Sequence, residues 1–347
     1  MDAFARLLAD GTTTVVLDGG LATQLEAQGA DLTDALWSAR LLLEDPEEIV
    51  RAHLAFFRAG AQVATTASYQ ATFEGFAGRG IGHEEAEALL RLSVRLAADA
   101  RRRWLEERAA PEGPPLFVAA SIGPYGAMLA DGSEFRGRYG LTVERLVDFH
   151  RERMAVLVDA DPDLLACETV PELEEGVALA RLVDELGAVA WLSYSCRDGG
   201  HLRSGAPVEE AFAVADEADG ILAVGVNCTA PEHVDELLDR ARSVTAKPLV
   251  VYPNSGERWD ARARAWTIAP APLDEGSSAA AVGAASTRRW VDHGARLVGG
   301  CCRVSPATIA EVSAGVAAWV AAGAAAEVAA GVAGGVAAGV AAADPGR

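Results

Sequence analysis

Short runs rich in β-branched residues alternate with amphipathic stretches along most of this sequence. That alternation is typical of βα units, in which parallel strands form a sheet and the intervening helices cover it. Eight units are present, and eight is the number that closes a parallel sheet into a barrel. The expected strands are 13–18, 62–68, 116–121, 164–168, 188–194, 221–227, 248–252 and 296–299. We therefore expect an α/β protein with a single (β/α)8 TIM-barrel domain over residues 1–322.

The stretches between these strands carry the signals of helix boundaries. Asp45 is a typical N-cap, Pro46 and Glu47 suit the first helical turn, and Gly60 suits a helix end just before the second strand. Two longer segments, 123–140 and 254–278, follow the third and seventh strands and are rich in glycine or polar residues. Long βα loops of this kind usually carry function, so we expect both beside the active site.

The end of the chain has a composition of its own. From about residue 312 it consists mainly of Ala, Gly and Val, and from Val328 a valine recurs every four residues. A membrane span is one interpretation, but alanine and glycine contribute little insertion energy and glycine weakens a helix. We therefore expect a last barrel helix from Pro306 to about Ala322, then a low-complexity extension over 323–347, and no membrane partner.

Charge and cysteine content limit the functional classes. A formal net charge of −20 disfavours nucleic acid, which requires clustered Lys and Arg. The first ten residues resemble an amphipathic helix rather than an export signal, so we expect a cytoplasmic protein. In that reducing compartment, five cysteines suggest metal binding or catalysis rather than disulfides.

Three of the cysteines follow strand ends. Cys301 and Cys302 are adjacent and come after two glycines, so a tight turn can direct both sulfurs at one point, and Cys228 follows the sixth strand. Three thiolates would leave one tetrahedral position of a zinc ion open, as in catalytic zinc sites. Cys228 lies far from the other two in sequence, so only barrel closure would bring them together. Cys167 and Cys196 are expected to be small buried hydrophobic residues.

Two carboxylates are expected on the same rim. Asp18 follows the first strand and Glu168 the fourth. Either residue alone could cap a helix or pair with an arginine. Together they would suit a substrate that bears an ammonium group.

At this point the sequence resembles a known family, the homocysteine S-methyltransferases, and most closely the bacterial branch that uses S-methylmethionine. The resemblance covers about residues 15–309. Its motifs are Leu17-Asp18-Gly19-Gly20 with Ala22-Thr23, Thr66-Ala67-Ser68-Tyr69-Gln70, Ser121-Ile122-Gly123-Pro124-Tyr125-Gly126, Ala166-Cys167-Glu168-Thr169, Gly225-Val226-Asn227-Cys228, Tyr252-Pro253-Asn254-Ser255-Gly256-Glu257 and Gly299-Gly300-Cys301-Cys302. The extension at the end of the chain has no counterpart in the family pattern.

The resemblance implies a barrel enzyme with Zn²⁺ on Cys228, Cys301 and Cys302 and with homocysteine sulfur as an incoming ligand. It also implies that Asp18 and Glu168 hold the ammonium group of homocysteine.

The remaining site residues follow from the same motifs. Trp37 and Tyr69 match positions where relatives that use betaine have aromatic side chains around the donor methyl groups. Asn227 is included among the substrate-binding residues with its motif. Asn254 and Ser255, with Glu257, are candidates for binding the amino acid head of a methyl-sulfonium donor.

Several alternatives stay open at this stage. The donor could be betaine or S-adenosylmethionine instead of S-methylmethionine. The chain could also be a barrel that binds zinc or homocysteine without catalysing a reaction. The sequence gives no indication of the oligomeric state.

Overall fold

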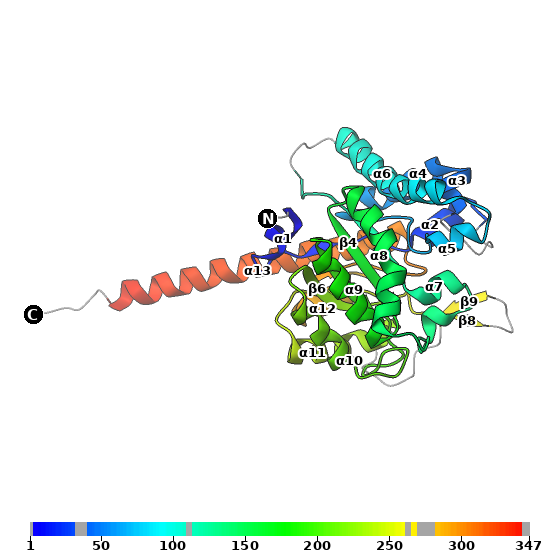
Figure 1. The fold of residues 1–347 in the computed structure, drawn as a ribbon. Coiled ribbons are helices and arrows are strands. Elements are labelled where there is room, and N and C mark those ends of the chain that lie inside the picture. The colour runs from blue at the N-terminus through cyan, green and yellow to red at the C-terminus, as the bar shows by residue number, and fades with distance from the viewer. Residues whose placement is uncertain (1–2, 32–39, 109–112, 261–264, 269–281, 342–347) are drawn as a thin grey trace, which may run out of the picture.

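The computed structural model describes residues 3–31, 40–108, 113–260, 265–268 and 282–341 (Figure 1). Its main sheet has eight parallel strands in the order β1-β10-β7-β6-β5-β4-β3-β2. These are β1 (Val15–Val16), β2 (Val63–Thr65), β3 (Phe117–Ile122), β4 (Leu164–Val170), β5 (Ala190–Tyr194), β6 (Ile221–Asn227), β7 (Leu249–Tyr252) and β10 (Ala295–Val298). Each strand coincides with an expected one, so the predicted (β/α)8 barrel is confirmed.

Helices cover the outside of this sheet (Figure 1). The longer ones are α4 (Pro46–Arg58), α6 (His83–Glu107), α8 (Val143–Asp159), α9 (Leu173–Glu185), α11 (Val234–Val244), α12 (Ala284–Asp292) and α13 (Pro306–Ala341). The shorter ones are α1 (Ala3–Leu8), α2 (Leu21–Ala27), α3 (Leu41–Glu44), α5 (Phe73–Ala77), α10 (Val208–Ala213) and the 3-10 turns η3 (Val214–Glu217) and η4 (Pro231–His233). Helix α4 begins as expected, because Asp45 accepts a hydrogen bond from the Glu48 amide. Gly60 follows it with a φ of 101°, a left-handed conformation that favours glycine.

Side chains pack the interior of the barrel at its amino-terminal end. Trp191 is fully buried there, and Phe4 of α1 contacts Phe117 edge to face, with ring centroids 4.9 Å apart. The same interior cluster contains Leu8, Val15, Leu17, Val63, Ala119, Leu164, Ala166, Ala223, Val250, Tyr252 and Leu297. Because packing closes this end, a binding site has to lie at the opposite rim, where the strands end.

The contact between β1 and β2 depends on side chains. The Gln62 amide donates to the Val16 carbonyl at 2.7 Å, and Gln62 Oε1 accepts from the Val16 amide at 3.1 Å. At the carboxyl end, Asp18 Oδ2 accepts from the Thr65 amide at 2.7 Å, and Asp18 Oδ1 accepts from Thr65 Oγ1 at 2.9 Å. These bonds join the first and second strands where a regular ladder is missing.

The two long loops contain structure of their own. The loop after β3 forms α7 (Tyr125–Leu129) and the 3-10 turn η2 (Ser133–Phe135). The loop after β7 contains an antiparallel hairpin of β8 (Glu257–Asp260) and β9 (Ala265–Ile268). Both loops leave the carboxyl ends of their strands, as predicted.

Helix α13 continues without interruption through residue 322, the boundary expected for the barrel (Figure 1). Its segment Pro306–Ala324 is long and apolar enough to cross a membrane. However, Ile309, Val312 and Val316 are buried against the barrel, and Trp319 Nε1 donates to Asp292 Oδ1 at 2.8 Å. Packing on the barrel therefore accounts for the apolar residues Ile309, Val312 and Val316 of this helix.

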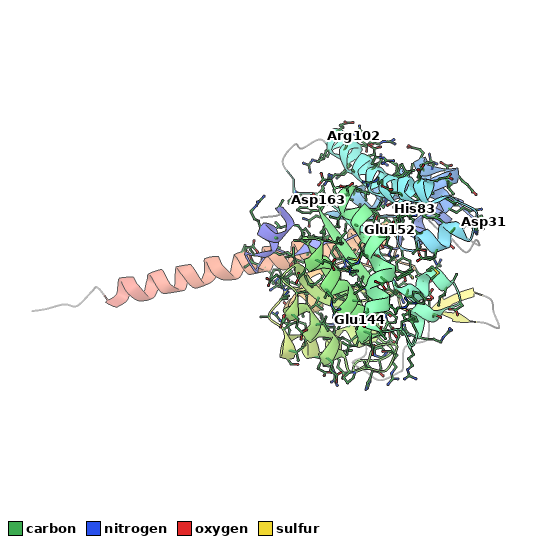
Figure 2. All side chains as sticks on the ribbon, viewed as in Figure 1. Asp31, His83, Arg102, Glu144, Glu152 and Asp163 are labelled. Carbon is green, nitrogen blue, oxygen red and sulfur yellow. The ribbon has the colours of Figure 1, made fainter. Side chains whose placement is uncertain are left out.

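Charged side chains project from the outer helices (Figure 2). Some connect neighbouring helices: Arg58 of α4 pairs with Glu107 of α6 at 2.7 Å, and His83 of α6 lies 3.1 Å from Glu152 of α8. Exposed pairs of this kind contribute about 0.2–1 kcal/mol each. The stability of the barrel therefore comes mainly from its core.

Candidate active site

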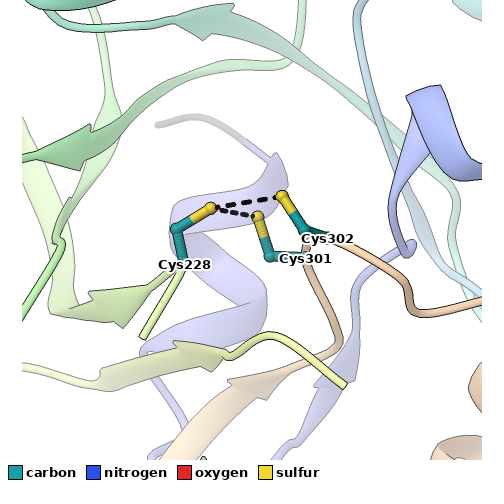
Figure 3. A group of neighbouring side chains, drawn as sticks. All are labelled: Cys228, Cys301 and Cys302. Carbon is teal, nitrogen blue, oxygen red and sulfur yellow. Dashed lines mark hydrogen bonds between the residues drawn. The ribbon is translucent and has the colours of Figure 1, made fainter. Parts of the chain in front are cut away.

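Three cysteine sulfurs converge at the carboxyl rim of the barrel. Cys228 directly follows β6, and Cys301 and Cys302 are the third and fourth residues after the end of β10. Cys228 Sγ lies 2.8 Å from Cys301 Sγ and 3.6 Å from Cys302 Sγ, and the three sulfurs are all within 4.8 Å of one another. Figure 3 shows the three side chains pointing toward one another from two separate loops. Barrel closure therefore brings together the residues that the sequence separates.

Two glycines allow the cysteine turn to approach the first strand. A Cβ atom on Gly299 would lie 2.7 Å from Leu17 Cβ, and one on Gly300 would lie 2.2 Å from Val304 Cγ1. The Gly300 amide also donates to the Asp18 carbonyl at 3.1 Å. A larger residue at either position would require neighbouring atoms to shift, so Gly299 lets the turn lie against Leu17 and Asp18, and Gly300 lets it fold against Val304.

The sulfur atoms influence one another strongly. Hydrogen bonds from the thiols of Cys228 and Cys301 hold the pKa of Cys302 well below its usual value. The pKa of Cys301 is raised well above its usual value, because its thiol bonds to Cys228 and Cys302 and is buried. All three sulfurs could therefore ionise together only with a cation bound between them, and thiolates are the ligands that soft or borderline metals such as zinc prefer. The residues present thus fit a metal ion.

Three non-glycine residues around the cysteines have left-handed backbones. They are Thr169, Cys228 and Arg303, with φ values of 62°, 46° and 65°. Such a conformation is unfavourable for residues with a Cβ and especially for a β-branched one, so surrounding contacts must enforce it.

Asn227 provides those contacts for Thr169. Its Oδ1 accepts from the Thr169 amide at 2.7 Å and from Ser193 Oγ at 2.9 Å. Its Nδ2 donates to Thr169 Oγ1 at 2.7 Å and lies 3.9 Å from Cys301 Sγ. The side chain is fully buried. Asn227 therefore connects the end of β4, where Glu168 lies, to the cysteine cluster.

Two buried carboxylates face the same rim. Asp18 is 4% exposed and Glu168 is 8% exposed. Glu168 Oε1 accepts a hydrogen bond from Ser121 Oγ at 2.5 Å. Burial raises the pKa of Asp18 to about 7 and the pKa of Glu168 to about 7. A cationic group bound between them would favour their charged forms.

A cavity of about 690 Å³ connects the cysteines and the carboxylates. That volume is in the range usual for small-molecule sites, about 300–1,000 Å³. Its wall includes Asp18, Glu26, Thr65, Tyr69, Glu134, Phe135, Glu168, Cys228, Tyr252, Cys301, Cys302 and Arg303. The site therefore combines a cluster of three cysteine sulfurs, acidic groups and aromatic residues.

Comparison with known proteins agrees with this arrangement. The sequence profile of the family described as Homocysteine S-methyltransferase matches residues 15–316. The chain is 46% identical to the homocysteine S-methyltransferase YbgG of Bacillus subtilis, over 88% of this chain and 96% of that protein.

The chain belongs to the homocysteine S-methyltransferase family.

Two further relatives extend the comparison. The structure of the Escherichia coli homocysteine methyltransferase MmuM in its metallated form is similar, with a TM-score of 0.78 at 44% identity, covering 89% of this chain and 98% of that one. A selenocysteine Se-methyltransferase of Brassica oleracea is 42% identical over 88% of this chain and 90% of that protein. The resemblance predicted from the motifs is thus confirmed, and the chain is an enzyme of this homocysteine methyltransferase family.

Of the two aromatic residues predicted to bind the donor, Tyr69 and Trp37, the structure describes only Tyr69. Tyr69 lines the cavity and is held against Gly123, where a Cβ atom would lie 2.4 Å from the Tyr69 carbonyl. Trp37 lies outside the described residues. Tyr252 also lines the cavity, and its hydroxyl accepts from Trp191 Nε1 at 2.9 Å.

The polar residues predicted from the seventh loop support the cysteine turn. The Ser255 amide donates to the Cys302 carbonyl at 3.1 Å, and the Asn254 amide donates to the Thr229 carbonyl at 3.0 Å. Glu257 Oε2 accepts from Arg303 Nε at 2.9 Å. Asn254, Ser255 and Glu257 are not among the described residues that line the cavity.

Several cavity residues were not singled out from the sequence, among them Thr65, Glu134, Phe135 and Arg303. Glu134 and Phe135 belong to the 123–140 loop, which was expected to be functional because of its length. The sequence did not indicate which of its residues would turn inward.

Removing the Asn227 side chain tests its role in the methyltransferase site. We expect Asn227→Ala to lower the free energy of unfolding by about 1–3 kcal/mol, because it leaves the buried Thr169 amide without its acceptor. Urea unfolding followed by circular dichroism measures this. Ser193→Ala is the comparison variant, because it removes one partner of Asn227 and one bond to the Tyr252 hydroxyl but keeps both bonds between Asn227 and Thr169. An equal loss in the two variants would contradict a special role for the contacts with Thr169.

Proposed function

We propose that this chain transfers a methyl group from S-methylmethionine to the thiol of homocysteine, forming methionine, with a zinc ion held by Cys228, Cys301 and Cys302. The observation that carries the proposal is the convergence of three cysteine sulfurs on the wall of a cavity that also contains two buried carboxylates.

The cysteine set suits a catalytic metal. Three protein ligands leave one position of a tetrahedral zinc ion for a substrate atom, whereas structural zinc sites use four. When bound, a zinc ion would keep the homocysteine sulfur in its thiolate form, which is the nucleophilic form of a thiol. The chain's own residues then have to hold and orient the two substrates.

Asp18 and Glu168 are suited to hold the ammonium group of homocysteine. Both line the cavity, and each keeps accepting capacity beyond the bonds that it makes to the barrel, since a carboxylate has about four acceptor positions. Charged hydrogen bonds to an ammonium group contribute roughly 1.5–3 kcal/mol each.

The wall of the cavity includes aromatic residues. Tyr69, Phe135 and Tyr252 line it, and cationic methyl groups bind favourably to aromatic faces. In the reaction, the bond between the methyl carbon and the donor sulfur breaks and its electron pair stays on that sulfur, while the homocysteine sulfur forms the new bond. The donor leaves as neutral methionine, so no side chain has to protonate it, and alignment of the two sulfurs supplies much of the catalysis.

We expect the purified chain to contain about one zinc ion, and Cys228→Ser, Cys301→Ser and Cys302→Ser each to lose most of it. Metal analysis by mass spectrometry measures the content, and a chelator should remove the activity together with the metal. Cys196→Ala is the control, because this buried cysteine is not part of the cluster. A metal-free enzyme with full activity would contradict the zinc site.

We expect Glu168→Gln to raise the KM for homocysteine roughly 10- to 100-fold while zinc is retained, because a charged bond to the ammonium is lost. The wild-type KM should fall as the pH rises through about 7, since the pKa of Glu168 is about 7 and its charged form binds the cation. This pH dependence should weaken in Glu168→Gln.

Asp18→Asn should have a similar effect on the KM for homocysteine. Because this substitution also alters the hydrogen bonds to Thr65, the free energy of unfolding of the variant has to be measured too. Loss of zinc in Glu168→Gln would indicate that Glu168 supports metal binding and not the binding of the ammonium group.

The donor is tested by measuring kcat/KM for S-methylmethionine, betaine and S-adenosylmethionine at saturating homocysteine. We expect S-methylmethionine to be the best donor, because the motifs around Tyr69, Tyr125 and Tyr252 resemble the branch that uses it. The same assay with selenocysteine tests the acceptor range suggested by the Brassica relative. A preference for betaine would overturn the choice of donor, and no transfer from any donor would favour a binding protein without turnover.

A further inference from the structure

The cavity has an excess of negative charge. Four carboxylates line it, from Asp18, Glu26, Glu134 and Glu168, against one guanidinium, from Arg303. Arg303 is itself paired with Glu257 at 2.9 Å. The excess is larger than one homocysteine ammonium requires, so the cavity is suited to a second cationic group.

Glu134 differs from the other three acids in its contacts. Asp18 and Glu168 accept hydrogen bonds from Thr65 and Ser121, and Glu26 is exposed at the edge. Glu134 Oε2 is completely buried and has no hydrogen-bond partner in the part of the chain that the structure describes. Burial raises the pKa of Glu134, and the charge of the nearby Asp131 raises it further. A buried oxygen of this kind is unfavourable unless a ligand supplies a donor.

The backbone around Glu134 is held in position. Asp131 Oδ1 accepts from the Ser133 amide at 2.9 Å, which fixes the start of η2. A Cβ atom on Gly126 of α7 would lie 2.4 Å from the Glu134 amide nitrogen, so the two parts of the loop are in close contact. Gln70 Nε2 donates to the Ala127 carbonyl at 3.2 Å and ties α7 to the loop after β2. Glu134 therefore belongs to a turn, η2, whose backbone is held by contacts with Asp131 and α7.

We propose that Glu134 binds the α-ammonium group of the methyl donor and thereby selects an amino acid sulfonium over donors without an amino group. The inference rests on the proposed function, in which Asp18 and Glu168 are occupied by homocysteine. An ammonium group carries three N–H donors, and one of them satisfies the buried Oε2 atom.

The ammonium group, and not the sulfonium, is the partner that the chemistry favours. The sulfonium loses its charge during methyl transfer, so an anion beside it would stabilise the bound donor more than the transition state. The ammonium keeps its charge throughout. A bond to it lowers KM for the donor and leaves kcat unchanged, because substrate and transition state are stabilised equally.

The test compares wild type with Glu134→Gln, which keeps the shape of the side chain and removes its charge. We expect the KM for S-methylmethionine to rise at least about 10-fold, with kcat, the KM for homocysteine and zinc content unchanged. Glu134→Asp, which keeps the charge on a shorter side chain, should give an intermediate KM. Calorimetry of S-methylmethionine binding in the absence of homocysteine should rank the affinities in the same order: wild type tightest, Glu134→Asp intermediate and Glu134→Gln weakest.

Two controls separate the possible outcomes. Glu144→Gln makes the same charge change on α8, where Glu144 is 72% exposed, and should leave all constants unchanged (Figure 2). The donor 3-(dimethylsulfonio)propanoate, which has a sulfonium and a carboxylate but no amino group, should bind wild type and Glu134→Gln equally.

An unchanged KM for S-methylmethionine in Glu134→Gln would overturn the proposal, and so would a raised kcat or a loss of zinc. If wild type binds S-methylmethionine but forms no methionine from it, the proposed function fails, while calorimetry still decides the role of Glu134.

Discussion

The contact between β1 and β2 is the interaction on which the rest of the structure depends. A parallel barrel has a rim only if its first and second strands are joined, and here Gln62 and Asp18 make much of that joint through their side chains. The Asp18 carbonyl also accepts from Gly300, at the start of the cysteine turn. One short segment therefore closes the sheet, presents a carboxylate to the cavity and positions the turn that carries Cys301 and Cys302.

Much of this architecture could be predicted from local sequence. Buried parallel strands are short apolar runs with turn residues at their ends, so all eight were recognisable, and 221–227 agrees with β6 at both ends. Asp45 and Gly60 marked the limits of α4 because N-caps and left-handed helix ends have narrow residue preferences. The adjacent cysteines after two glycines indicated a metal site, since few other arrangements need that combination.

Other features could not be predicted, because they depend on contacts between distant segments. Asn227 was grouped with substrate-binding residues, yet it is fully buried and contacts Thr169, Ser193 and Cys301. Glu134 is one of two acids in a long loop, and only the folding of η2 against α7 turns it, and not Asp131, into the cavity. The hairpin of β8 and β9 was likewise hidden in a segment that reads as polar loop.

The left-handed backbones of Thr169, Cys228 and Arg303 have a consequence for how this protein can evolve or be engineered. Each conformation costs about 1–3 kcal/mol, and that strain is present in the folded chain before any ligand arrives. Glycine at these positions would relax the backbone, but it would remove the Cys228 thiol, the Thr169 hydroxyl or the Arg303 side chain. Substitutions that relieve this strain would stabilise the fold but would remove side chains from the site. Selection for stability and selection for the present site therefore act in opposite directions at these three residues.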